Sequence, residues 1–173
     1  EGVVLFSMMG TAVLLPYLVA VKSLWHRLGR GRVAILDDGT LTAQDRGILA
    51  HHCGDPEIIR LDDVQSGPFP KGGCWERFLT ILDRRQTEYW IQLDSDTVTI
   101  GPVPEVAGAI SANRSFTLLG GADAGTAPVP VKQIATRFYP EITDGHVQAA
   151  IESRFGQMPS THQWRYIRGS AGF

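Results

Sequence analysis

Short apolar runs alternate with helical patterns along the first hundred residues, and this alternation limits the fold more than any other feature of the sequence. Each run is rich in aliphatic or aromatic residues and is bounded by polar residues, Gly or Pro, as buried strands are. Strands separated by helices form right-handed βαβ crossovers, which build a largely parallel sheet. The predicted strands cover residues 3–7, 32–36, 57–61 and 89–93, and the predicted helices cover about residues 11–28, 42–52 and 73–85.

The start of the chain raises the question of a membrane segment, because residues 2–21 carry no charge and a membrane helix needs about 20 apolar residues. Several residues interrupt this run, and no basic region precedes it. The interruptions are Ser7, Gly10, Thr11 and Pro16. We therefore predict a buried strand to Ser7, a loop over residues 8–10 and a helix ended by Gly29. On this interpretation membrane association is not indicated, and a cytoplasmic location is expected.

The helix predicted near residues 73–85 has an apolar stripe with the i, i+3, i+4, i+7 spacing of an amphipathic helix. The stripe consists of Trp75, Phe78, Leu79 and Leu82. We expect this stripe to face the core. The same pattern places Arg77 on the solvent side of the helix.

The second half of the chain has weaker patterns. We predict helices over residues 104–112 and 145–155 and strands over residues 116–119 and 163–168. A length of 173 residues predicts one domain, covering residues 1–173. Because the chain starts with Glu1 and stops just after a Gly-Ser-Ala-Gly run, we expect a fragment that is truncated at its C-terminal end.

Composition excludes some classes of partner. With 43% apolar and 20% charged residues the chain has the make-up of an ordinary globular protein. A net charge of -2 gives no basic footprint, so we expect no nucleic-acid partner. The two cysteines, Cys53 and Cys74, have no metal-binding or redox spacing.

An acidic pair follows the fourth predicted strand. If the backbone stays extended through Ser95, the side chains of Asp94 and Asp96 project to the same side. Two carboxylates suit Mn²⁺ or Mg²⁺, with water and substrate phosphates as the other ligands. The alternative is a solvated turn after a core strand.

Other polar residues fall at the same edge of the predicted sheet. Ser7 and the Asp37-Asp38 pair also lie at strand carboxyl ends, where parallel sheets bind ligands. Lys71 precedes Gly72-Gly73 and a helix, an arrangement that can hold a diphosphate. Asp37 and Asp38 are equally consistent with a plain turn, and Lys71 with a solvated lysine.

Several segments together resemble nucleotide-sugar glycosyltransferases of the GT-A fold, in a bacterial-looking group. They are the strand into Asp94-Ser95-Asp96 with its continuation over residues 98–105, the segment 75–79, the turn 37–40 and residues 168–173. The resemblance covers most of the chain. It implies a Rossmann-like GT-A sandwich with a mostly parallel central sheet and helices on both faces.

The resemblance also implies a donor site for a UDP- or GDP-sugar, with Mn²⁺ or Mg²⁺ held by Asp94 and Asp96. The residues it implies for donor binding are Ser7, Met8, Asp37, Asp38, Lys71, Arg77, Asp94 and Ser95. The cation and the basic side chains would stabilise the departing nucleoside diphosphate. The acceptor is unknown. No catalytic base is assigned, because Asp123, Glu141 and Asp144 are expected in loops or caps.

Two alternatives remain open at this stage. The segment 93–98 also resembles the first motif of haloacid-dehalogenase-type phosphatases, with Asp94 as nucleophile and Asp96 as acid/base. That family carries the motif on its opening strand, whereas three strand-helix units precede it in this chain. The other alternative is a domain that binds a nucleotide sugar without catalysis.

Overall fold

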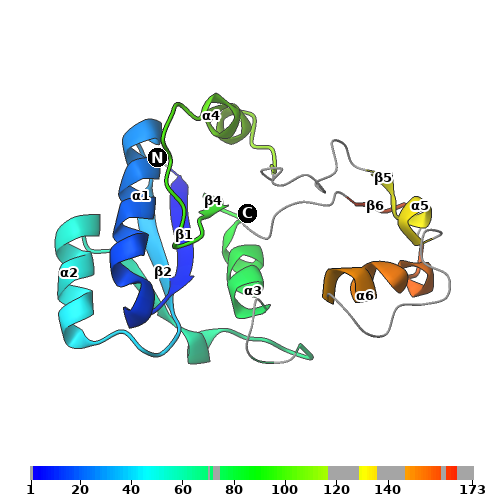
Figure 1. Ribbon diagram of the computed structural model, residues 1–173, viewed down its shortest axis with the longest axis horizontal. Helices are drawn as coiled ribbons and strands as arrows, with labels where there is room; N and C mark the ends of the chain where they lie inside the picture. Colours follow the sequence, from blue (N-terminus) through cyan, green and yellow to red (C-terminus); the bar gives the residue numbers. More distant parts are fainter. Residues whose placement is uncertain are drawn as a thin grey trace. The chain divides into compact units, whose positions relative to one another are not determined.

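The structure is a computed structural model that describes residues 2–69, 71, 75–116, 129–135, 147–160 and 163–166. The chain divides into two compact units, residues 1–116 with 172–173 and residues 117–171 (Figure 1). The two units are described separately. One nucleotide-sugar-binding domain over residues 1–173 remains a prediction.

The first unit is an α/β fold built on a parallel sheet. Its strands lie in the order β3-β2-β1-β4, and all three neighbouring pairs are parallel. The predicted Rossmann-like fold class is confirmed. The elements are β1 (Val3–Met9), η1 (Thr11–Val13), α1 (Leu14–Leu28), β2 (Arg32–Asp37), α2 (Ala43–Cys53), β3 (Glu57–Arg60), η2 (Leu61–Asp63), α3 (Trp75–Arg84), β4 (Tyr89–Gln92) and α4 (Pro104–Ser111).

Strand β1 lies inside the sheet and is longer than predicted. Met8 pairs with Leu36 of β2, and Met9 pairs with Asp37. The predicted loop over residues 8–10 is therefore wrong for both methionines, because pairing with a neighbouring strand keeps them extended. A short 3₁₀ turn then separates β1 from α1.

Helices cover both faces of the sheet, as predicted. Side chains alternate between the faces of a strand, so Val3 and Leu5 belong to one core cluster while Val4 and Phe6 belong to another. The first cluster packs against α1, α2 and α4, and the second packs against η2 and α3. Figure 1 shows α1 and α2 on one side of the strands and α3 on the other.

The ends of α1 and α2 follow their sequence signals. Helix α1 stops at Gly29, whose φ of 68° is a left-handed conformation that glycine adopts easily. Helix α2 begins with the predicted capping box, in which Thr42 and Asp45 bond each other's backbone N–H. None of the helices in the described part of the chain has the length and apolarity that crossing a bilayer requires.

Helix α3 packs by the face that the sequence pattern assigns to solvent. Glu76 and Thr80 are buried, whereas Trp75 and Phe78 are 38% and 50% exposed. The prediction that the Trp75 stripe faces the core is therefore wrong. The hydroxyl of Thr80 donates to the Glu76 carbonyl (2.7 Å), so it is hydrogen-bonded within the helix, and Ile81 supplies the apolar contact with the sheet.

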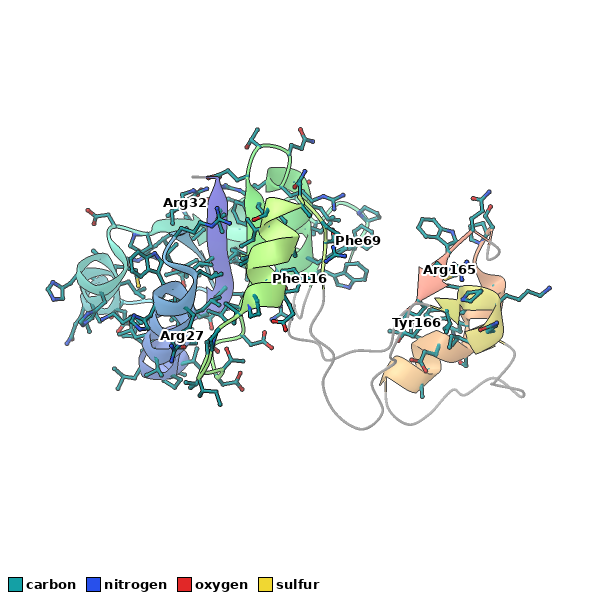
Figure 2. The ribbon with its side chains drawn as sticks, turned by 90° about the horizontal axis from the view of Figure 1, so that it is seen from above. Arg27, Arg32, Phe69, Phe116, Arg165 and Tyr166 are labelled. Carbon is teal, nitrogen blue, oxygen red and sulfur yellow. The ribbon has the colours of Figure 1, made fainter. Side chains whose placement is uncertain are left out.

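Ion pairs hold together the amino ends of the strands, which we call the amino edge. Arg32, labelled in Figure 2, bonds Glu88 through Nε (2.9 Å) and Nη2 (2.5 Å), and bonds Glu57 through Nη1 (2.8 Å). Arg84 also bonds Glu57. The guanidinium groups of Arg32 and Arg84 both lie near the ring of Trp90, at 5.8 and 5.9 Å from its centroid.

These bonds change the pKa values of the two carboxyl groups. Hydrogen bonds from Arg32 lower the pKa of Glu88. Burial acts to raise the pKa of Glu57, but the bonds from Arg32 and Arg84 together outweigh it and lower that pKa. The ionised form of both carboxyl groups is therefore favoured more strongly in the folded chain than in the unfolded chain.

The second unit has a small core of its own. Val131, Ile134 and Phe155 are buried together, and the ring of Tyr166 packs edge-on against Phe155 at 4.9 Å between centroids. Its described elements are β5 (Val129–Pro130), α5 (Val131–Ala135), α6 (Val147–Ser153), η3 (Phe155–Gln157) and β6 (Arg165–Tyr166), with β5 and β6 antiparallel.

Predictions for this part of the chain are tested only in places. The helix predicted over residues 145–155 overlaps α6, and the strand predicted over 163–168 overlaps β6; residues 145–146 and 167–168 lie outside the described part of the chain. The strand predicted over residues 116–119 lies outside the described residues after Phe116. So do Asp123, Glu141 and Asp144.

Candidate functional site

The carboxyl ends of β1 and β4 lie side by side at one edge of the sheet, which we call the carboxyl edge. The chain proceeds from β1 to β2 and β3 on one side and then places β4 on the other side of β1. In parallel α/β sheets, ligands bind outside the carboxyl ends of the strands. The residues that follow β1 and β4 are therefore candidates for a binding site.

Ser7 fixes the end of β4. Its hydroxyl donates to the carbonyl of Leu93 (2.6 Å), and the N–H of Leu93 donates to the carbonyl of Phe6 (2.8 Å). Ser7 is buried at 1% exposure. The side chain of this predicted donor-binding residue thus anchors the backbone from which Asp94 emerges.

Arg77 and Asp94 meet at the carboxyl edge. Nη1 of Arg77, in the first turn of α3, lies 3.2 Å from Oδ1 of Asp94, and both side chains are partly buried. The sequence pattern alone assigns Arg77 to solvent, so the structure corrects that expectation and brings together two residues predicted for donor binding. A guanidinium in this position can donate to a phosphate as well as to a carboxylate.

The backbone turns after Asp94. Strand β4 ends at Gln92, and Ser95 and Asp96 lie in a turn that Thr97 supports by donating its hydroxyl to the Asp94 carbonyl (3.0 Å). The premise of an extended backbone through Ser95 is therefore wrong. The turn, rather than strand alternation, sets the relative positions of Asp94 and Asp96.

The acidic pair keeps acceptor capacity. Within the described residues, no hydrogen bond reaches Oδ2 of Asp94, and the exposed side chain of Asp96 has no ion-pair or hydrogen-bond partner. No group of three or more His, Cys, Asp or Glu side chains in that part of the chain is placed to hold a metal. A cation at Asp94 and Asp96 would therefore take its remaining ligands from water and a bound phosphate, as Mg²⁺ and Mn²⁺ commonly do.

Loops after β1 and β2 form the other side of the carboxyl edge. Exposed Asp38 accepts through Oδ1 from the N–H (3.0 Å) and hydroxyl (2.6 Å) of Thr40. Thr11 N–H donates to the Thr40 hydroxyl oxygen (3.0 Å). A Cβ on Gly10 would lie 2.1 Å from both Asp38 Oδ1 and Thr40 Oγ1, so only glycine fits between these loops.

The carboxylate of Asp37 is hydrogen-bonded within its own turn. It is buried, and Oδ1 accepts from the N–H groups of Gly39 (2.8 Å) and Leu41 (3.2 Å), while Oδ2 binds Arg46. Its carboxylate shapes the turn that presents Asp38. A role for Asp37 in donor binding remains a prediction.

Asp45 joins the same loop system, a role that the capping-box pattern does not reveal. Its Oδ2 lies 2.7 Å from the Thr11 hydroxyl and 2.9 Å from the Thr42 N–H. Hydrogen bonds from Thr11, and then those from Thr42, lower the pKa of Asp45. The spacing from Thr42 to Asp45 predicts the cap, but no sequence signal predicts the contact with Thr11.

The remaining predicted site residues are separate from this network. Met8 is half-buried on the sheet face that carries Val4 and Phe6. Lys71 is exposed, and Gly72 and Gly73 lie outside the described residues, so the proposed phosphate-binding arrangement there remains a prediction.

Comparisons with known proteins leave the family open. No protein-family model and no curated protein matches the sequence. One solved structure with a similar arrangement is S. aureus TarS 1-349, which is 10% identical to this chain, with a TM-score of 0.43. The match covers 99% of this chain, which spans 58% of the TarS chain. Neither fold nor function is inferred from that likeness.

Proposed function

We propose that this chain is a GT-A-like domain that binds a nucleoside-diphosphate sugar and serves the transfer of its glycosyl group to an acceptor. The observation that carries the proposal is the ion pair of Arg77 and Asp94 at the carboxyl edge of the sheet, just after β4. A metal-bound diphosphate needs partners of both charges, and this pair supplies one of each. The neighbouring Asp96 adds a second carboxylate.

Each group of residues at the carboxyl edge has a distinct role in this proposal. Asp94, through Oδ2, and Asp96 would hold Mn²⁺ or Mg²⁺, which when bound would neutralise charge on the leaving diphosphate. Arg77 donates to the phosphates, and Lys71 adds positive charge. Ser95 lies in the same turn and would border the donor.

The nucleoside would lie toward the loops after β1 and β2. Met8 and Asp38 border that end of the sheet, and Asp38 keeps Oδ2 free of hydrogen bonds within the described residues. Ser7 and Asp37 contribute by position, because their bonds fix Leu93 and the turn after β2.

Calorimetric titration with UDP and GDP, with and without Mn²⁺, tests the proposal. We expect one nucleotide to bind in the presence of Mn²⁺ and binding to be lost when a chelator is added. The proposal would be contradicted if neither nucleotide bound under any condition, or if binding persisted after the chelator was added.

The same protein separates the alternatives. A phosphatase that uses Asp94 as nucleophile would be inhibited by beryllofluoride and would release phosphate without any nucleotide. A binding domain without catalysis would bind the nucleotide with Mn²⁺ but fail to transfer sugar to any acceptor. The transferase requires both binding and transfer.

A further inference from the structure

The segment after the acidic turn lies along helix α1. The N–H of Thr99 donates to the Ser23 hydroxyl oxygen (3.0 Å), and Arg27 donates through Nη2 to the Ile100 carbonyl (3.0 Å). Ser23 and Arg27 are one helical turn apart, so residues 98–100 follow the helix. We call α1 together with residues 98–100 the α1 surface; Figure 2 labels Arg27 on it.

Large aliphatic side chains protrude from the α1 surface. Leu15 and Val19 are 70% and 53% exposed, and Val98 and Ile100 are 58% and 86% exposed. Leu15, Val19, Ser23 and Arg27 repeat every four residues and therefore share one side of the helix. Exposed aliphatic side chains that gather on one face of a protein can mark a surface that binds a partner.

The other half of the same surface is basic. A groove of about 640 Å³ runs along α1, with Leu15, Leu18 and Val19 lining it together with Lys22, His26 and Arg27. No carboxylate lines this groove, and α1 contains no Asp or Glu. Among the described residues, neither Lys22 nor Arg27 has a carboxylate within ion-pair distance, in contrast to Arg32 and Arg77.

We infer that the α1 surface docks on an anionic lipid bilayer. Helices that lie in a membrane interface combine protruding aliphatic side chains with lysine and arginine. Protein interfaces instead favour aromatic residues and arginine, and they are depleted in lysine. The basic half of α1 therefore complements a negatively charged membrane better than a second protein surface.

This inference departs from the expectation that membrane association is not indicated. The uncharged residues 2–21 divide between a buried strand and the first half of α1, so no spanning helix forms. The strand takes part in the core, while Leu15 and Val19 reach the surface. Hydropathy along the chain does not distinguish the buried strand from the exposed side of the helix.

Vesicle flotation with the intact chain tests the inference. We expect the protein to float with vesicles that mix phosphatidylglycerol and phosphatidylcholine, to stay unbound with phosphatidylcholine alone, and to dissociate as salt is added. Equal binding to both vesicles, or binding to neither, would overturn it. This result is independent of nucleotide binding, so the proposed function can fail while the docking holds.

Variants locate the surface. Lys22→Gln should weaken binding to the anionic vesicles about five-fold, since one basic residue near such a membrane contributes ~1 kcal/mol. The double variant Leu15→Ser with Ile100→Ser should weaken it about ten-fold or more, because aliphatic area no longer leaves water. Both changes fall on exposed side chains, so thermal unfolding should be unaffected.

Matched controls lie on other elements. Arg60→Gln removes an exposed cation at the end of β3, and Phe78→Ser removes an apolar side chain that is half exposed on α3. Neither should change flotation. If the controls weaken binding as much as the α1 variants, or if Leu15→Ser with Ile100→Ser abolishes self-association in sedimentation and leaves flotation intact, docking by this surface is wrong.

Discussion

Arginine–carboxylate ion pairs occur at both ends of the parallel sheet, but they leave different numbers of carboxylate oxygens unpaired. At the amino edge, Glu88 receives two bonds from Arg32, and Glu57 is bonded by both Arg32 and Arg84. At the carboxyl end of β4, Asp94 receives one bond from Arg77, and Asp96 receives none from the described residues. The first set stabilises the fold, whereas the second retains capacity for a ligand.

This difference teaches where to look for chemistry in a sheet of this type. Carboxylates whose oxygens are all paired within the chain add stability but cannot coordinate an ion without losing those bonds. Carboxylates held in place yet incompletely paired can accept a cation at little cost. Variants at the two ends should therefore separate stability from binding.

The largest expected effect is at Asp96. Asp96→Asn should weaken Mn²⁺-dependent nucleotide binding by about 100-fold or more, a loss at the top of the range for groups that support a metal. Because Asp96 is exposed, the free energy of unfolding should change by less than about 0.5 kcal/mol. Titration calorimetry and urea unfolding measure the two quantities. Asp62→Asn, which changes an exposed carboxylate in η2, should alter neither.

Arg77 should affect both properties. Arg77→Gln removes a charged donor from the carboxyl edge, and we expect nucleotide affinity to fall about ten-fold, which is ~1.4 kcal/mol, close to the lower limit for hydrogen bonds to charged groups. Loss of the pair with Asp94 should also destabilise the fold by about 1 kcal/mol. Arg77→Lys should restore part of the affinity. If stability falls while affinity is unchanged, Arg77 acts only in the fold.

Glu88 should show the opposite behaviour. Glu88→Gln weakens the two-pronged bond with Arg32, which is partly exposed, so we expect a loss of about 1 kcal/mol in the free energy of unfolding. Nucleotide affinity should not change. Glu105→Gln, at an exposed carboxylate on α4, is the control for urea unfolding. A weaker nucleotide affinity in Glu88→Gln would show that the two ends of the sheet are coupled.

The smallest effect concerns pH. The ordinary pKa of both Glu57 and Glu88 is 4.5, and both are lower in the folded chain. Their contribution to stability is therefore complete above pH 4.5 and is lost as the pH falls through the lower folded values. Urea unfolding midpoints should decline below pH 4.5, and this decline should be shallower in Glu88→Gln. An equal decline in both proteins would assign it to other carboxyl groups.

Local signals in the sequence predict much of this fold. The strand-helix alternation predicts the parallel sheet, Gly29 predicts the end of α1, and Thr42 with Asp45 predicts the start of α2. Each of these features depends on residues that are neighbours in the chain. Local pattern therefore suffices for them.

Features that depend on distant partners are not predictable in this way. The apolar spacing of α3 does not predict that Glu76 and Thr80 face inward. That orientation depends on contacts with residues outside the helix, such as the ion pair of Arg77 with Asp94, which follows β4. Met8 and Met9 are extended because they pair with β2. The turn at Ser95 likewise depends on where residues 98–100 attach.

The attachment of residues 98–100 to α1 has a consequence for the acidic turn. Leu93 is bonded to β1 on one side of the turn, and Thr99 is bonded to Ser23 on the other. Residues 94–98 are thus held at both ends by hydrogen bonds to other elements. A loop fixed at both ends loses little conformational entropy when it binds a ligand, because folding has already ordered most of it.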